Sequence, residues 1–78
     1  LVYDHHRHEL AQKVTDIQHD HFAEIIATMH VHLDHDNCLE VILLRGRADR
    51  IKRCAGSLIG TRGVKHGQFV PTTTGIDL

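Results

Sequence analysis

The sequence has few aromatic residues, one proline, no tryptophan and no long apolar run. No tract approaches the roughly 20 apolar residues that a membrane-spanning helix needs, and no signal peptide is visible. We therefore do not expect a membrane-spanning protein, and the two cysteines described below favour the reducing cytoplasm. The formal net charge of −1, counted with neutral histidine, argues against a free-standing nucleic-acid-binding protein.

The chain is short and does not begin with methionine. Its 78 residues, 1–78, make a single domain. A chain of this size buries only about 60% of the surface that its unfolded form exposes, so we expect a metal, a disulfide or partner chains to add stability. Leu1 lies inside an apolar stretch, which predicts a fragment whose first strand is truncated.

Cysteine is scarce, and the two cysteines differ in their surroundings. Cys38 lies among histidines, whereas Cys54 lies in a helical pattern and is expected in the core. This difference favours reduced thiols and metal–thiolate chemistry over a disulfide. There is no Gly-rich phosphate loop and no hydrolase triad pattern, and histidines aligned with Cys38 are more typical of ligands than of a nucleophile's base. We do not expect an enzyme.

Histidine, in contrast, is abundant, with nine residues, and residues 29–40 hold three of them. This stretch is typical of two strands joined by a tight turn, in which alternate residues share a face. If His32 pairs with Cys38 and His30 with Glu40, the other face is fully apolar and carries Met29, Val31, Leu33, Leu39, Val41 and Leu43. A slip of one residue would leave neither face apolar, so this register is favoured, with an odd-numbered loop centred on His35.

The favoured register brings His30, His32 and Cys38 to one face of the sheet, which predicts a metal site with nitrogen and sulfur ligands. Thiolate and imidazole suit zinc, copper or nickel, whereas magnesium and calcium prefer oxygen. The spacing alone does not separate these three metals. Glu40 faces His30 across the ladder, where it could orient the imidazole or simply be a solvated strand residue.

Three ligands leave a fourth position open, and His19 and His21 are the nearest candidates in the sequence. A strand rises about 20 Å between Glu24 and His30, so a histidine at the end of the preceding helix is far from this site in its own chain. Either histidine would have to come from another subunit. Histidines at a helix end also interact favourably with the helix dipole without any further role, so this point stays open.

The remaining histidines have no clear assignment from the residues alone. His5, His6 and His8 cluster at the start of the first helix, where His5 and His8 could share a weak metal site, although solvated side chains are the better interpretation. His35 is expected to be solvated at the turn, and His66 to be structural or interfacial. The basic run Arg45–Arg53 is interpreted as a solvated helix face, with contact to nucleic acid or to an acidic partner as the alternative.

The periodicity predicts an α+β fold of the ferredoxin-like βαββαβ type, with two helices on one face of a four-stranded antiparallel sheet. The expected strands are 1–3, 22–33, 38–45 and 64–70, the expected helices 7–19 and 49–61, and Gly63 is expected to close the second helix. The helix-free face is predicted to form an interface and to carry Ile26, Thr28, His30, His32, Cys38, Glu40, Ile42 and Leu44. The tail after Pro71 has no interpretable pattern.

Several of these segments together resemble a known family. The run from Tyr3 to Gln68 is similar to the C-terminal, metal-sensing domain of the nickel-responsive transcriptional regulators, the NikR family. The matching segments are His19 after Gln18, the strand TMHVHL at 28–33, the turn DHDNCLE at 34–40, and RGVKHG at 62–67. The combination of HVH with CLE is specific, and the likeness covers almost the whole chain.

The resemblance implies an ACT-type ferredoxin-like domain that assembles into a homotetramer through the sheet face. It implies Ni²⁺ bound in a square plane by His30, His32 and Cys38 of one chain and His19 of its neighbour. It also implies that operator DNA is bound only through an N-terminal ribbon-helix-helix domain, which this chain lacks. Arg47 departs from the pattern, because a helix-capping side chain is expected there.

Two alternatives to a nickel-responsive repressor domain remain. One is a zinc or copper binding or storage protein, because copper binds such ligands more tightly than nickel does. The other is an ACT-like regulatory module that binds a small organic ligand at the same interface.

Overall fold

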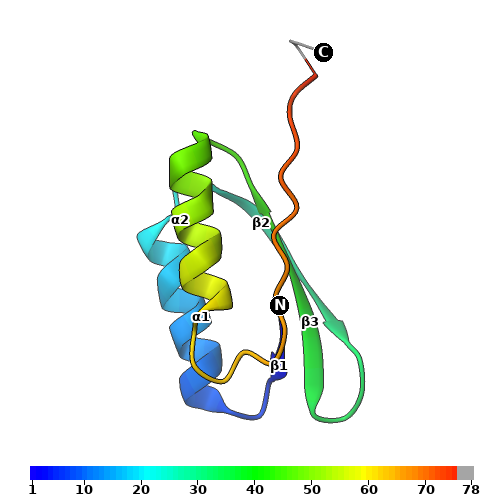
Figure 1. Ribbon diagram of the computed structural model, residues 1–78. Helices are drawn as coiled ribbons and strands as arrows, with labels where there is room; N and C mark the ends of the chain where they lie inside the picture. Colours follow the sequence, from blue (N-terminus) through cyan, green and yellow to red (C-terminus); the bar gives the residue numbers. More distant parts are fainter. Residues whose placement is uncertain (76–78) are drawn as a thin grey trace.

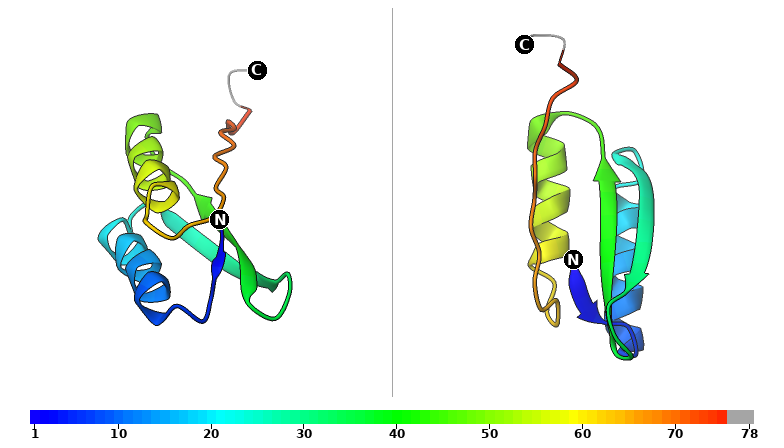
Figure 2. Two further views of the ribbon diagram at one scale, coloured as in Figure 1. Left: turned by 60° about the horizontal axis from the view of Figure 1, so that its bottom comes forward. Right: turned by 90° about the vertical axis from the view of Figure 1, so that its right-hand side faces the viewer.

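The computed structural model describes residues 1–75, which fold into two layers (Figure 1). The elements in chain order are strand β1 (Val2–Asp4), helix α1 (His8–Asp20), strands β2 (Ile25–His32) and β3 (Asn37–Leu44), and helix α2 (Ala48–Ile59). Both helices lie on the same side of the sheet (Figure 2). The predicted α+β class is therefore confirmed, and in the described part of the chain neither helix is long and apolar enough to cross a membrane.

The β2–β3 hairpin has the register that the apolar pattern predicts. His32 lies opposite Cys38 and His30 opposite Glu40. The carboxylate of Asp34 shapes the turn by accepting hydrogen bonds from the backbone N–H groups of Asp36 (2.9 Å) and Asn37 (2.8 Å). These hydrogen bonds, with those of Asn37 the largest cause, lower the pKa of Asp34.

The sheet has three strands in the order β1-β3-β2, all antiparallel to their neighbours. The predicted fourth strand at 64–70 is reduced to an isolated bridge between Val2 and His66, in which the N–H of Val2 donates to the carbonyl of His66 at 2.8 Å. In an antiparallel pairing Gly67 would meet Leu1, so the residues after Gly67 run past β1 and find no ladder partner within residues 1–75. The four-stranded sheet is thus not formed in the described chain.

The predicted choice of the helix-free face was wrong. Cys38 and Glu40 are each only 2% exposed, and Cys38 packs in the core that both helices share. The core residues are Tyr3, Leu10, Val14, Ile17, Cys38, Cys54 and Leu58. The sequence pattern misleads because both faces of β3 are largely apolar, and because the buried carboxylate of Glu40 finds partners on α1 and β1 instead of water.

The opposite face of the hairpin is free of helices and apolar. Its exposed side chains include Met29 (57% exposed), Val31 and Leu43 (55% exposed). A register shift between Ile25 and Ala27 also changes the start of β2. Ile25 packs against the core, while Ile26, which was expected in the row of His30 and His32, is 54% exposed.

The helices begin close to the predicted positions, and α2 supplies the second cysteine of the core. Cys54 is fully buried, as predicted for a packing residue, and burial, followed by the charge of Glu24, raises the pKa of its thiol. Both cysteines of the chain are free. Arg47 precedes α2 without a capping hydrogen bond from its side chain in the described structure, and its Nε lies 3.3 Å from a carboxylate oxygen of Asp49.

Candidate metal centre

Three chemically distinct side chains are aligned across the strands close to the hairpin turn. In β3, Cys38 lies between Tyr3 of β1 and His32 of β2. Directly paired residues share a face, so all three belong to the face that the helices cover. Because β2 is an edge strand, the imidazoles of His30 and His32 extend from the covered centre to the rim of the sheet, where both residues are exposed.

Glu40 is the polar centre of this face. One carboxylate oxygen accepts a hydrogen bond from the hydroxyl of Tyr3 at 2.6 Å, and the other accepts one from the amide Nε2 of Gln18 in α1, also at 2.6 Å. His30 Nε2 lies 3.3 Å from the oxygen that Tyr3 contacts. The buried carboxylate thereby joins β1, α1 and β2 around the candidate ligands.

Burial is the largest reason why the pKa of Tyr3 is raised far above its ordinary value, and its hydrogen bond to Glu40 is the next. The phenol therefore stays protonated at neutral pH and remains a donor to the carboxylate. This arrangement fixes the direction of the hydrogen bond from Tyr3 to Glu40, whose carboxylate lies beside His30.

The predicted ligands share a face but are not gathered around a point. Among residues 1–75, the only group of three or more His, Cys, Asp or Glu side chains whose ligand atoms all lie within 4.8 Å of one another is His6, His35 and Asp36. The imidazole of His32 instead meets that of His5 edge-on, with ring centroids 5.2 Å apart. In a single chain, Cys38 is buried while the two β2 histidines remain in solvent.

His19 lies in the last turn of α1 and is exposed. Successive helix residues are about 100° apart, and Gln18 is directed at the sheet, so His19 is turned away from it. Its imidazole makes no hydrogen bond or ion pair with any other residue in the range 1–75. His21 follows at the end of α1 and is half-buried, and its N–H donates to the carbonyls of Ile17 and Gln18.

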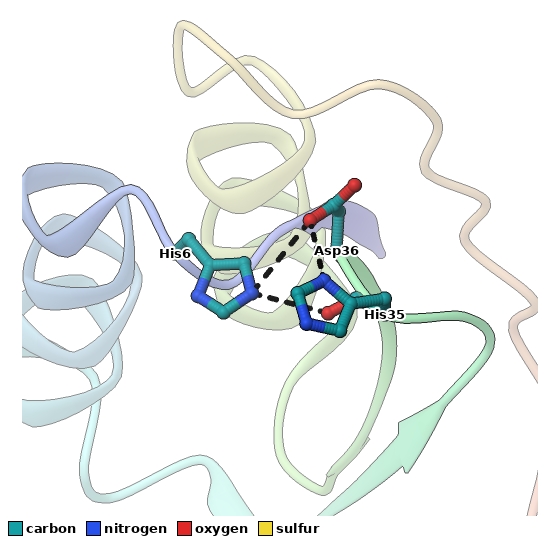
Figure 3. Close-up of side chains that lie close together, drawn as sticks. All are labelled: His6, His35 and Asp36. Carbon is teal, nitrogen blue, oxygen red and sulfur yellow. Dashed lines mark hydrogen bonds and ion pairs between the residues drawn. The ribbon is translucent and has the colours of Figure 1, made fainter.

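Sequence reasoning missed a cluster at the end of the hairpin (Figure 3). His5 Nε2 and His6 Nε2 both lie close to the backbone carbonyl oxygen of His35, at 3.0 and 3.1 Å. The signal was available, because β1 pairs with β3 and the turn that follows β1 must meet the turn that precedes β3. The ligand atoms that lie close together belong to His6, His35 and Asp36, so neither His5 nor His8, the pair that the sequence suggested, supplies one of them.

Comparison with known proteins identifies relatives over the full chain. Residues 1–72 match the family model described as the NikR C terminal nickel binding domain. The chain is 55% identical over 78 residues to proteins from Nitratidesulfovibrio vulgaris and Solibacter usitatus, and 54% identical to one from Geobacter metallireducens. Each of these is named "Putative nickel-responsive regulator". The match covers 100% of this chain and 56% of each relative, so the chain spans about half of their length.

Proposed function

We propose that this chain, which belongs to the NikR C terminal nickel binding domain family, is the nickel-sensing part of a transcriptional repressor. The single observation that carries the proposal is the pairing of His32 with Cys38 on the face that also holds His30. A thiolate next to imidazoles, on rigid strands and beside a buried carboxylate, is suited to a borderline divalent ion and unsuited to magnesium or calcium.

In this proposal Ni²⁺ is bound by His30, His32 and Cys38 of one chain and by His19 of a neighbouring chain. Two features support it. The imidazoles of His30 and His32 lie on an edge strand that a second molecule can approach, and His19 is exposed and without a side-chain partner among residues 1–75. Metal binding would require that the Cys38 thiol loses its proton and that the imidazoles are neutral, so the affinity for the metal depends on pH.

Glu40 acts in the proposal as a positioning residue. The proximity of His30 Nε2 to its carboxylate, at 3.3 Å, leaves the other ring nitrogen, Nδ1, for the metal. Hydrogen-bonded partners of this kind fix the tautomer and the orientation of a ligating imidazole. Tyr3 and Gln18 in turn hold the carboxylate, so a change at the metal is transmitted to β1 and α1.

We further propose a homotetramer that buries the helix-free face of the sheet. The row formed by Met29, Val31, Leu33 and Leu43 is exposed by 37 to 57% in a single chain. A contiguous apolar row of this kind is typical of a surface that contacts protein. The Val2–His66 bridge supports a related proposal, that residues 64–70 become the fourth strand of an ACT-type ferredoxin-like sheet once a longer strand is available beside them.

The remaining length of the relatives would supply the DNA contacts. We propose an N-terminal ribbon-helix-helix domain that binds the operator in the cytoplasm, and a tetramer whose preferred arrangement is shifted by nickel. Under this proposal the present chain senses metal and assembles but does not bind DNA by itself. No catalytic step is needed for this role.

The test of the ligand set is a mixing experiment with two variants. Neither His19→Ala nor Cys38→Ala should show tight nickel binding or the sulfur-to-nickel charge-transfer band of a planar site. When the two variants are mixed in equal amounts and reassembled, about a quarter of the sites should recover. Half of the subunit contacts then pair one variant with the other, and each symmetric contact holds two sites. In a mixed contact one site has all four ligands, and the other lacks both His19 and Cys38. His21→Ala serves as the matched control and should bind nickel normally.

No recovery on mixing would show that the site does not span two chains. A colourless tetrahedral site that prefers zinc would favour the alternative of a zinc-binding protein, and a small-molecule response that survives Cys38→Ala would favour the ACT-like module. These three outcomes differ in spectrum and in stoichiometry, so the experiment separates them.

The apolar interface is tested by placing a charge in it. Leu43→Glu should weaken assembly by about 100-fold, because an unpaired carboxylate in an apolar contact costs on the order of 3 kcal/mol. Sedimentation velocity at several concentrations measures the change. Phe22→Glu is the control, since Phe22 is 79% exposed but lies outside the sheet face. Equal effects of both substitutions would count against the proposed interface.

A further inference from the structure

The turn between β1 and α1 and the tip of the β2–β3 hairpin meet at one end of the sheet (Figure 3). His6 comes from the first turn and His35 and Asp36 from the second, and all three are exposed. We propose that these three side chains form a second, weaker metal site for a borderline divalent ion such as Ni²⁺, Zn²⁺ or Cu²⁺. This inference does not depend on the proposed nickel centre, because it shares no ligand with it.

The distances are close to those of a coordinated ion. His35 Nδ1 lies 3.0 Å and His6 Nε2 lies 3.7 Å from the same carboxylate oxygen of Asp36. All three ligand atoms are within 4.8 Å of one another. Metal–nitrogen and metal–oxygen bonds of about 2.0–2.2 Å allow two ligands of one ion to be at most about 4.4 Å apart. A shift of a few tenths of an ångström in exposed side chains therefore suffices.

The backbone that carries the three ligands is already held in place. The N–H of His5 donates to the carbonyl of Asp36 at 3.0 Å, which fastens the first turn to the hairpin. A carboxylate oxygen of Asp4 accepts from the N–H of His6 at 2.9 Å, and one of Asp34 accepts from the N–H of Asp36 at 2.9 Å. An arriving ion has to order only side chains, which lowers the entropic cost of binding.

The donor set determines the class of ion. Two imidazoles and one carboxylate suit zinc, nickel and copper, while a single carboxylate is too few for calcium, and no sulfur is present to select soft ions. Because the cluster is exposed, water completes the coordination, and we expect weaker binding than at a thiolate centre. Nickel with such nitrogen and oxygen ligands would be octahedral and paramagnetic, unlike planar nickel bound by a thiolate.

The experiment uses the chain without a histidine tag and adds Ni²⁺ beyond one equivalent. Bound metal is counted by equilibrium dialysis with elemental analysis, and paramagnetic broadening of amide NMR signals locates the ion. We expect a second binding step that broadens the signals of residues 5–7 and 34–37. The step should persist in Cys38→Ser, where the thiolate centre is lost, and should weaken at least 10-fold in His35→Ala and in Asp36→Asn.

His8→Ala is the matched control, because His8 is an exposed histidine two positions from His6 and is outside the cluster. It should leave the second step unchanged. Circular dichroism confirms that each variant keeps its fold. The proposal is overturned if no second step exists, if Asp36→Asn binds as the wild type does, or if His8→Ala removes the step. Loss of the first step alone would contradict the proposed nickel centre and leave the tip site intact.

Discussion

Tyr3 offers the sharpest test of the buried network, because a single oxygen atom can be removed without changing the shape of the core. The residue is 2% exposed, and its hydroxyl donates to Glu40 at 2.6 Å. A hydrogen bond to a charged group contributes about 1.5–3 kcal/mol, and Gln18 would still hold the other carboxylate oxygen in Tyr3→Phe. We therefore expect a loss of about 2 kcal/mol in the free energy of unfolding, or about 10 °C in melting temperature for a chain of this size.

The same substitution predicts a change in the dependence of stability on pH. The pKa of Tyr3 is raised in the folded state from an unfolded value of about 10, so the folded chain keeps a proton that the unfolded chain loses. The contribution of this proton to the free energy of unfolding is complete below pH 10, and it is lost as the pH rises through the pKa of Tyr3 in the folded state. The wild type should lose about 1.4 kcal/mol per pH unit more than Tyr3→Phe above pH 10. Contributions from Cys54 and the lysines are the same in both proteins and cancel in the difference.

Both quantities come from urea unfolding followed by circular dichroism between pH 7 and pH 11. The two proteins must be compared at one protein concentration, since association shifts apparent stability. A change below about 0.5 kcal/mol at pH 7 would mean that the hydroxyl is not a structural donor to Glu40, as expected of an ordinary surface substitution. Parallel pH profiles would refute the inference that the phenol is held protonated by burial.

Two further predictions concern the helices, and both are measured by chemical unfolding. Arg50→Ala should destabilise the chain by about 1–3 kcal/mol, because Arg50 is paired with the carboxylate of Glu24, which is 4% exposed; Arg53→Ala in the same helix should change little. Gly63→Ala should destabilise by about 1–2 kcal/mol, since its φ is +102° and the added Cβ would lie 3.0–3.1 Å from neighbouring side chains. Gly56→Ala, with nothing within 4 Å of the added atom, should stabilise α2 by about 0.5–1 kcal/mol. Equal effects of Arg50→Ala and Arg53→Ala, or of Gly63→Ala and Gly56→Ala, would contradict these predictions.

The parts of the fold that the sequence predicted rest on strict periodicity. The hairpin register follows from alternation, because only one register produces a fully apolar row. The helices follow from apolar spacing. The prediction that Gly63 closes the second helix was wrong, because α2 ends at Ile59 with Gly60 as its C-cap, and Gly63 has its positive φ in the loop beyond. For the register and the helices, a local pattern has one physically favourable solution.

The other predictions depended on contacts between distant segments. The alternation along β3 left both of its faces largely apolar, and the covered face was decided by Gln18 and Tyr3, which satisfy the buried carboxylate of Glu40. The fourth strand needed a partner longer than β1. The cluster of His6 and His35 required knowledge that two turns meet, which no pattern within either turn contains. The ligand set of His19, His30, His32 and Cys38 stays a prediction.

The depth of Cys38 has a consequence for the chemistry of its sulfur. With 2% of the residue accessible, peroxide and alkylating reagents reach the thiol only in molecules whose helices have moved off the sheet. The rate of thiol labelling would then measure how often the helices separate from the sheet. Any factor that holds the two layers together would also protect the sulfur from irreversible oxidation.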